Sequence, residues 1–295
     1  MSRRRIGITL GDVTGIGPEI VAKALASRKL DRKFDYEVIG DPHTKCRSDA
    51  INWVVQGARR CLSGELAALV TAPISKQLLR DAGYRFEGHT ELLAHIAHTK
   101  RFAMMLIGPP SPRLRRASGP LRVALVTIHV PLSKVPRLLS TKRIAEVIEL
   151  SHDACKRFGI RRPRIGVAGL NPHAGESGLL GDEEQRIIAP AIHSAKRKGM
   201  NVTGPWPADT LFHKAYRGEF DAVVAMYHDQ GLAPLKMIAF DSGVNLTLGL
   251  PFVRTSPDHG TAFDIAGKGI ANPDSMIAAI NLAAKLTQRR TGAKN

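Results

Sequence analysis

The sequence predicts an α/β protein that has a mainly parallel sheet and is divided into two lobes. Short apolar runs alternate with longer amphipathic segments along the whole chain, which is the pattern of repeated strand–helix units. The 295 residues are more than one hydrophobic core usually serves, so two lobes are more natural than one. A hydrophobic content of 43% and a charged content of 23% fit an ordinary globular protein.

The expected elements follow from this alternation. The strands are expected at Arg5–Leu10, Tyr36–Ile39, Ala67–Thr71, Phe102–Leu106, Arg122–Ile128, Arg164–Ala168, Ala222–Met226 and Val244–Leu248. The helices are expected at Pro18–Ala26, Ile51–Ser63, Thr90–His98, Thr141–Phe158, Glu183–Lys198 and Asp274–Arg289. Pro18 and Glu19 suit the first turn of a helix, because proline has no N–H to satisfy there and a carboxylate favours the positive end of the dipole. The proline-rich stretch 109–120 is expected to be a loop or a crossing between lobes.

Composition argues against several classes of protein. No apolar stretch approaches the roughly 20 residues that a membrane span needs. The basic start resembles a signal peptide, but Gly11 and Asp12 interrupt the apolar run that follows it too early. The cysteines Cys46, Cys61 and Cys155 show no paired spacing, which favours a reducing compartment. We therefore expect a cytoplasmic protein with no membrane partner.

The net charge of +17 raises the alternative of a basic protein that binds nucleic acid. The basic residues are scattered in short clusters, however, and aromatic residues make up only 5% of the chain. No helix-turn-helix, zinc-finger or RNA-recognition pattern is present. A positive field can also steer a small anionic substrate to its site. We expect a solvated basic surface and no nucleic-acid partner.

Three histidines each stand where an expected strand runs out into a loop. His129 follows the run ending at Ile128, His173 lies in an Asn-Pro-His-Ala-Gly-Glu segment, and His228 leads into Asp-Gln-Gly. Ligands of open α/β sheets bind outside the carboxyl ends of the strands, and imidazoles are common ligands of divalent metals. Any one of the three is more simply explained as a strand cap, but their shared placement favours a metal site.

Carboxylates accompany these histidines. Asp209 lies in a rigid loop that feeds a helix, and it caps that helix, ligates the metal or acts as a general base. Asp229, next to His228, allows the same interpretations. Glu176 is placed to orient the imidazole of His173.

Cationic and polar residues indicate an anion site. Lys236, Asn245 and Arg254 lie around the last expected strand, where lysine and arginine can bind a phosphate. His89 and Thr90 begin an expected helix and can donate to a phosphate or a carboxylate, although a plain helix cap is an equally good explanation.

Two segments could serve a nucleotide. The turn at 11–19 is rich in glycine and joins a strand to a helix, but its spacing matches no dinucleotide or P-loop pattern, and tight turn geometry explains it equally well. In the segment 258–273, small residues surround His259, and Asp264 is placed to accept from ribose hydroxyls. The spacing alone does not establish a nucleotide site.

Taken together, these segments resemble the 4-hydroxythreonine-4-phosphate dehydrogenase family. The resemblance runs in order over nearly the whole chain, through the blocks 11–19, 71–76, 88–91, 171–176, 204–212, 227–236 and 244–267. It implies a fold of the isocitrate/isopropylmalate dehydrogenase type, with an active-site cleft between two lobes. We expect residues 1–118 with 250–295 to form the cofactor-side lobe, and residues 119–249 to form the lobe for metal, substrate and dimerisation.

The resemblance also implies roles for residues. The metal (zinc, magnesium, cobalt or manganese) would be held by His129, His173 and His228, and the base would be Asp209 or Asp229. The substrate would be bound by His89, Thr90, Lys236, Asn245 and Arg254. NAD or NADP would be bound by His259, Gly260, Thr261, Asp264 and Asn272. Family members are homodimers with shared sites, so His228 would serve the partner's site.

The implied reaction is the oxidation and decarboxylation of a phosphorylated 3-hydroxy acid, and 4-phosphohydroxythreonine is the first choice of substrate. The blocks 71–76 and 238–243 are closer to the second branch of the family, which includes threonate and erythronate 4-phosphate dehydrogenases. A dihydrodiol carboxylate dehydrogenase is a further alternative. The chain also lacks residues that the family carries between Asp41 and Val54, which leaves open a paralogue that binds its ligand but turns over poorly.

Overall fold

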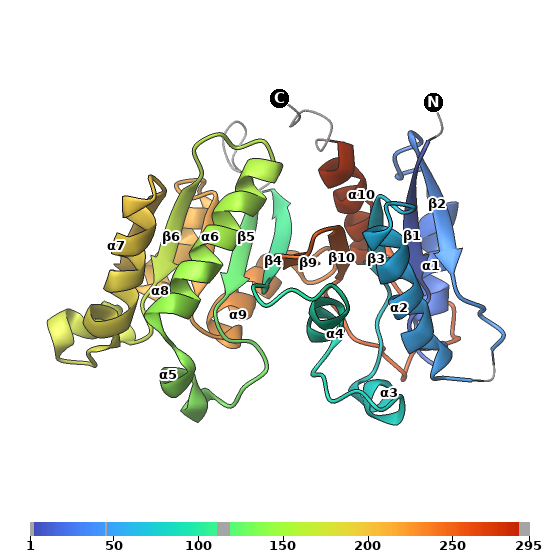
Figure 1. The fold of residues 1–295 in the computed structure, drawn as a ribbon, viewed down its shortest axis with the longest axis horizontal. Coiled ribbons are helices and arrows are strands. Elements are labelled where there is room, and N and C mark those ends of the chain that lie inside the picture. The colour runs from blue at the N-terminus through green and yellow to red at the C-terminus, as the bar shows by residue number, and fades with distance from the viewer. Residues whose placement is uncertain (1–2, 45, 111–118, 289–295) are drawn as a thin grey trace. The chain divides into compact units, whose positions relative to one another are not determined.

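The computed structural model describes residues 3–44, 46–110 and 119–288. The chain forms two compact units (Figure 1). Unit 1 consists of residues 1–100 and 241–295, and unit 2 consists of residues 101–240. The chain therefore changes units at 100/101 and 240/241, whereas the sequence placed the lobe limits at 118/119 and 249/250. No helix in the described part of the chain is long and apolar enough to cross a membrane.

Unit 1 is a five-stranded sheet between two helical layers in its described part. Its strands are β1 (Arg4–Thr9), β2 (Phe34–Ile39), β3 (Ala68–Thr71), β9 (Val244–Leu248) and β10 (Val253–Pro257). Its helices are α1 (Gly17–Ala26), α2 (Asp49–Leu62), α3 (Lys76–Asp81), α4 (His89–Ile96) and α10 (Asp274–Gln288). The strand order is β2-β1-β3-β10-β9, and only the β9–β10 pair is antiparallel among these strands. Helices α1 and α10 pack together on one face of the sheet, and α2 and α4 pack together on the other.

Unit 2 repeats this architecture. Its strands are β4 (Ala103–Pro110), β5 (Pro120–Leu125), β6 (Arg164–Ala168), β7 (Asn201–Trp206) and β8 (Ala222–Ala225). Its helices are α5 (Val135–Leu138), α6 (Thr141–Arg157), α7 (Ala189–Arg197), α8 (Ala208–Tyr216) and α9 (His228–Ala239). The strand order is β4-β5-β8-β6-β7, in which only β4–β5 is antiparallel among the described strands. Helices α6 and α7 contact each other on one face, and α8 and α9 pack their apolar residues on the other (Figure 1).

The α/β class and the mainly parallel sheet are confirmed, and an element lies at every place where a strand or helix was expected. The largest change is in the helix expected at Glu183–Lys198, where Glu184–Ile188 form a π-helical turn and α7 begins only at Ala189. Strand β5 ends at Leu125 instead of Ile128, so His129 lies four residues beyond it. Of the expected loop at 109–120, residues 109, 110 and 120 belong to β4 and β5, and residues 111–118 lie outside the described part.

Several elements were not expected from the sequence. Strand β10 contains Arg254, Thr255 and Ser256, which are polar and yet buried. Strand β7 contains Gly204 and Pro205, which are unusual in strands. Helix α9 contains Pro234, which normally interrupts a helix. The short helices α3 and α5 carry too few turns for an apolar period to be visible.

Candidate functional site

Arg254 is the most deeply buried cation among the described residues of unit 1. Only 1% of its surface is exposed, and it lies on β10 between β9 and β3. Its guanidinium donates to the hydroxyls of Thr71 (Nη2–Oγ1 2.6 Å) and Thr247 (Nη1–Oγ1 3.0 Å). Burial lowers its pKa to about 9, although the charge of Glu91 acts in the opposite direction. The group is still charged at neutral pH, and the partners that hold it are neutral.

A buried guanidinium held by hydroxyls is a ready receptor for an anion. Removing a charge from water is costly unless an opposite charge accompanies it. Arginine also matches the geometry of phosphate and carboxylate oxygens with two parallel hydrogen bonds. The fixed position of Arg254 therefore favours the binding of a phosphate or carboxylate in unit 1.

Other predicted substrate residues lie in the same unit and present unsatisfied polar atoms. His89 and Thr90 begin α4, and Asn245 lies two residues before Thr247 on the same face of β9. The Nε2 atom of His89 and the Oδ1 atom of Asn245 are buried without a hydrogen-bond partner among the described residues. Burial, with a smaller contribution from the charge of Arg254, holds the pKa of His89 well below 6.5. Buried polar atoms are rarely left unpaired, so this set is suited to a ligand.

Two of the three predicted metal ligands lie side by side in unit 2. The order β5-β8-β6 places His228, which follows β8, between the segments of His129 and His173. The ring centroids of His129 and His228 are 5.6 Å apart. Among the described residues, no group of three or more His, Cys, Asp or Glu side chains could hold a metal ion. The structure thus brings two imidazoles together, and His173 does not complete a site with them within one chain.

The neighbouring carboxylates orient these rings. The Nδ1 atom of His228 lies 2.7 Å from Oδ1 of Asp229, so Nε2 is the ring nitrogen left for a ligand. This arrangement favours Asp229 as the residue that fixes the tautomer of His228. Nδ1 of His173 is 3.9 Å from Oε2 of Glu176, which is an ion-pair distance and too long for a hydrogen bond. The donor set fits a metal that prefers imidazole nitrogen.

The segment that carries His173 has an unusual backbone. Residues 173–177 all have positive φ angles, and four of these five residues are not glycine. The left-handed conformation costs roughly 1–2 kcal/mol per residue for an L-amino acid, so surrounding contacts must hold it. The turn ends near a π-helical turn, Glu184–Ile188, that leads into α7.

The two remaining polar candidates of unit 2 lie on helices. Asp209 is exposed in the first turn of α8, where no side-chain hydrogen bond caps the helix. Lys236 lies in the last turn of α9, and its Nζ is 5.6 Å from the ring centroid of Phe240. Asp209 therefore does not cap α8, and its exposed carboxylate is available to a ligand.

The predicted cofactor residues all lie in the connection between β10 and α10 in unit 1. His259 Nδ1 is 3.1 Å from the carbonyl of Gly260, and the carbonyl of Thr261 accepts a hydrogen bond from the Ile16 amide (2.9 Å). Asp264 is exposed, and Asn272 Oδ1 accepts from the Asp274 amide at the start of α10. Asn272 therefore has a structural role as a helix cap.

The glycine-rich turn packs against this connection. A Cβ on Gly15 would lie 2.7 Å from the Thr261 carbonyl oxygen, and one on Gly17 would lie 2.1 Å from that of Leu10. These contacts explain the glycines by close packing. Burial alone would raise the pKa of Asp12 in this turn, but hydrogen bonds from Arg47 and Thr14 hold it below its ordinary value. Arg47 lies between Asp41 and Val54, where the chain is shorter than the family. Its hydrogen bond to Asp12 joins this stretch to the glycine-rich turn.

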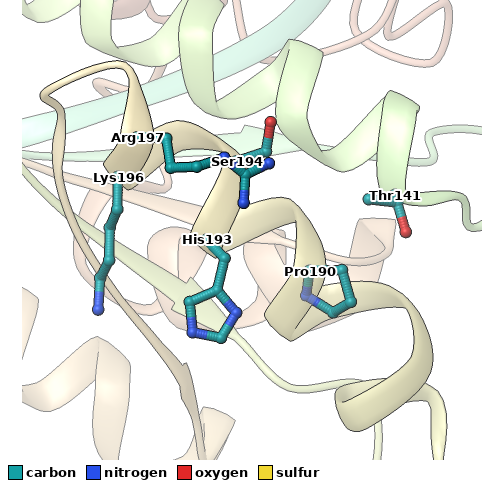
Figure 2. A pocket seen from close by; sticks show the side chains of 6 residues that line it. All are labelled: Thr141, Pro190, His193, Ser194, Lys196 and Arg197. Carbon is teal, nitrogen blue, oxygen red and sulfur yellow. The ribbon is translucent and has the colours of Figure 1, made fainter.

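Two surface hollows in the described part of the chain lie apart from these residues. One hollow in unit 2 is lined by α7 and the start of α6, and its polar side chains include His193, Lys196 and Arg197 (Figure 2). Another in unit 1 is formed by the segment 76–87, just before His89. Neither contains a predicted site residue, and open surface hollows of this kind do not by themselves define a site.

The fold is one that dehydrogenases use. An isocitrate dehydrogenase from Methylococcus capsulatus, 16% identical, has the same fold with a TM-score of 0.55 over 98% of this chain and 86% of its own. A terephthalate 1,2-cis-dihydrodiol dehydrogenase from Burkholderia xenovorans, 26% identical, gives 0.67 over 96% and 98%. The expected isocitrate dehydrogenase-like fold is confirmed.

The sequence comparisons show the family. The pattern of the family described as "Pyridoxal phosphate biosynthetic protein PdxA" matches residues 14–283. A "4-hydroxythreonine-4-phosphate dehydrogenase" of Geobacter metallireducens is 44% identical, with 97% of this chain and 96% of that protein covered. The crystal structure of a protein with that name from Klebsiella pneumoniae, 38% identical, gives a TM-score of 0.79 over 97% of this chain and 100% of its own. The chain belongs to the PdxA family and is a dehydrogenase.

Both branches of the family occur among the relatives. A protein of Oceanobacillus iheyensis named "Putative D-threonate 4-phosphate dehydrogenase" is 40% identical, with 95% of this chain and 97% of that protein covered. The alignment with the Geobacter protein extends over 337 positions, more than the 295 residues of this chain, so the relative carries residues that this chain lacks.

The sequence did not indicate the residues that hold the site in place. Thr71 and Thr247 bind Arg254, and Glu184 and Gln230 bind the segments before His173 and His228. Gln230 stands two residues after His228 and could have been suspected from that position. Nothing in the local sequence distinguishes Glu184 from its exposed neighbours.

Proposed function

We propose that this chain oxidises and decarboxylates a phosphorylated 3-hydroxy acid, with NAD or NADP as the hydride acceptor and a bound divalent cation. The substrate that we favour is 4-phosphohydroxythreonine, in pyridoxal phosphate biosynthesis, because the Geobacter and Klebsiella relatives are named after it and the family is described as a pyridoxal phosphate biosynthetic protein. The buried guanidinium of Arg254, whose hydrogen bonds go to the hydroxyls of Thr71 and Thr247, is the observation that carries the proposal, because a buried charge held by neutral groups favours an anionic ligand.

The residues of unit 1 would bind the phosphate. Arg254 would supply two parallel N–H donors and the positive charge, and His89, neutral at pH 7, would supply an Nε2–H donor. Thr90 and Asn245 would complete the set. Because Arg254 is already fixed by buried hydrogen bonds, little ordering of this side chain would be needed on binding.

The residues of unit 2 would handle the reacting hydroxyl. The imidazoles of His129, His173 and His228 would hold the cation, with Asp229 keeping the Nε2 atom of His228 free of its proton. When bound, the cation supplies positive charge that lowers the pKa of the hydroxyl, and the nicotinamide supplies the hydride acceptor. Asp209 would accept the hydroxyl proton, and Lys236 would stabilise negative charge on the substrate. Oxidation at C3 yields a β-keto acid, which loses CO2 readily.

The metal site needs a second copy of the chain in this proposal. His129 and His228 lie together, and within one described chain no third ligand joins them. We propose a homodimer in which the partner supplies the remaining imidazole. Leu179, Met237 and Phe240 of unit 2 are exposed by 84%, 86% and 71%, which is consistent with an apolar surface that a second copy covers.

The alternative substrates are D-threonate and D-erythronate 4-phosphate, favoured by the Oceanobacillus relative, and a dihydrodiol carboxylate. The first two carry the same phosphate and differ from 4-phosphohydroxythreonine mainly at the amine, so the phosphate residues do not separate them. A nucleic-acid-binding role has no support beyond the net charge of +17.

A substrate panel tests the proposal. The formation of reduced cofactor would be followed with each of the three phosphorylated acids, their dephosphorylated counterparts, and both NAD and NADP. We expect the largest kcat/KM for 4-phosphohydroxythreonine and a loss of about 100-fold or more without the phosphate, since a charged hydrogen-bonded contact is worth about 1.5–3 kcal/mol per bond. Equal rates with and without the phosphate would contradict the role of Arg254.

A further inference from the structure

Two side chains outside the predicted site join the strand ends of unit 2 from which the histidines emerge. We propose that Gln230 and Glu184 are positioning residues that set the geometry of the metal-binding histidines, an inference that rests on the proposed function. We call the hydrogen bonds they make the strand-end brace.

Gln230 links the segments that precede two of the histidines. Its Oε1 atom accepts from the amide of Met226, two residues before His228 (2.7 Å). Its Nε2 atom donates to the carbonyl of Gly169, four residues before His173 (2.7 Å). One side-chain amide therefore joins the end of β8 to the end of β6 and uses both of its polar atoms.

The link continues to the third histidine through Thr127. The backbone amide and the hydroxyl of Thr127 both donate to the carbonyl of Met226, at 3.2 Å and 2.8 Å. Thr127 is buried and lies two residues before His129. Met226 is thus bound on its N–H side by Gln230 and on its carbonyl side by Thr127, so the segments before His129 and His228 are held against each other.

Glu184 holds the start of the left-handed turn that bears His173. It is only 3% exposed, and its Oε1 atom accepts from the amides of Leu170 (2.7 Å) and Asn171 (2.8 Å). Its Oε2 atom accepts from Nδ2 of Asn171 (3.0 Å). A Cβ on Gly175 would lie 2.8 Å from Oε2, so the carboxylate also fits closely against the turn.

The hydrogen bonds of Glu184 are suited to fixing the backbone of the turn that bears His173. A run of positive φ angles is unfavourable and persists only where neighbouring groups fix it. Both carboxylate oxygens of Glu184 accept hydrogen bonds from Leu170 or Asn171, directly before the turn. Groups behind the ligands of a metal site commonly control its affinity, and their loss typically costs 10-fold to 100-fold.

The test uses the full-length protein with Gln230→Met and Glu184→Met, which keep the length of the side chain and remove its hydrogen bonds. Gln185→Met is the matched control, since Gln185 is exposed and follows Glu184 directly. Binding of Co2+ to metal-free protein is measured by calorimetry, and amide hydrogen exchange of residues 170–180 is measured without metal. Binding of inorganic phosphate, followed by its effect on thermal unfolding, reports on unit 1.

We expect the Kd for Co2+ to rise 10-fold to 100-fold in both variants, with phosphate binding as in wild type and the control unchanged. We also expect faster exchange in residues 170–180 of Glu184→Met. Wild-type affinity for Co2+ in both variants, or unchanged exchange in Glu184→Met, would overturn the strand-end brace. Failure of the wild-type protein to bind Co2+ would instead refute the metal in the proposed function, and the exchange measurement would still decide whether Glu184 holds the turn.

Should Glu184→Met unfold, Glu184→Gln decides the matter. Glutamine retains an acceptor for the two backbone amides but presents an NH2 group toward Nδ2 of Asn171. We expect this variant to fold and to bind Co2+ with an affinity between those of wild type and Gln230→Met. An affinity equal to that of wild type, together with wild-type exchange, would overturn the role of Glu184.

Discussion

At the scale of single residues, the site is defined by groups whose charge state depends on burial. Arg254 is charged in the interior of unit 1 and is held by hydroxyls, and His89 nearby is kept neutral. A bound anion would offset the desolvation cost of the Arg254 charge and accept a hydrogen bond from His89.

Replacing Arg254 should abolish phosphate binding without lowering the free energy of unfolding. We expect the free energy of unfolding of Arg254→Met to equal or exceed that of wild type, because the substitution removes a buried charge whose hydrogen bonds go to neutral hydroxyls. Inorganic phosphate at 100 times its Kd should stabilise the wild-type protein by about 2.7 kcal/mol and leave Arg254→Met unaffected. Thermal unfolding with and without phosphate measures both effects.

The control is Arg122→Met, which removes another buried guanidinium, held in unit 2 by the Asp221 carbonyl. It should keep the stabilisation by phosphate. A phosphate effect that survives in Arg254→Met would refute the assignment of this residue.

His89 should make the stability of the protein depend on pH. Its pKa in the folded state lies well below 6.5, and in the unfolded chain it returns to about 6.5, so the unfolded state binds the extra proton first. Stability attributable to His89 is therefore intact above pH 6.5 and is lost as the pH falls below it, by at most about 1.4 kcal/mol per pH unit. Urea unfolding at pH 7, 6 and 5 should show a weaker decline in His89→Gln than in wild type.

His43→Gln, a change at an exposed histidine, serves as the comparison and should decline with pH as the wild type does. Equal declines in wild type and His89→Gln would show that His89 is not buried as described.

At the scale of the elements, the polar bonds that join one element to another determine where loops lie. Lys23 of α1 donates to the carbonyls of Gly269 and Ala271 (both 2.8 Å), and Glu19 accepts from the Ala271 amide (2.8 Å). These bonds hold the far end of the segment that we expect to bind the cofactor.

Loss of Lys23 should therefore weaken cofactor binding. We expect Lys23→Met to raise the KM for NAD or NADP about 10-fold, which corresponds to about 1.4 kcal/mol, because the segment must then be ordered on binding. Steady-state kinetics with varied cofactor measure this. Lys29→Met, at an exposed lysine paired with Asp274, should not change the KM, and a cofactor KM unaffected in Lys23→Met would count against this role of the loop.

Elements with a strong apolar period could be predicted from the sequence, and those fixed by distant contacts could not. Strand β6 is a buried apolar run, and its bounds were predicted without error. Strand β10 could not be recognised, because Arg254 is buried only through hydroxyls contributed by β3 and β9. The same holds for the candidate site: the histidines could be proposed from their place at strand ends, whereas Glu184 accepts a hydrogen bond from the amide of Leu170, 14 residues earlier in the chain.

At the scale of the whole molecule, the account requires that two copies share their metal sites. We expect His173→Ala and His228→Ala each to abolish activity. If the three imidazoles come from two chains, mixed dimers of these variants contain one intact site. Mixing the two proteins under exchange should then recover up to about a quarter of the wild-type activity, from half of the sites in half of the dimers.

Sedimentation of the mixture would show whether dimers form. The His228→Ala protein alone, taken through the same exchange procedure, serves as the baseline for activity. No recovery in a mixture that contains dimers would show that each chain builds its metal site alone, contrary to the homodimer proposed above.

The most direct test of the central claim is the reduction of NAD or NADP by 4-phosphohydroxythreonine before and after removal of divalent metal. We expect formation of reduced cofactor with release of CO2 and loss of activity on exhaustive chelation. Activity should recover when a divalent cation is returned to wild type but not when it is returned to His173→Ala. Full activity after exhaustive chelation, or no reduction of either cofactor in the presence of metal with any of the phosphorylated acids, would contradict it.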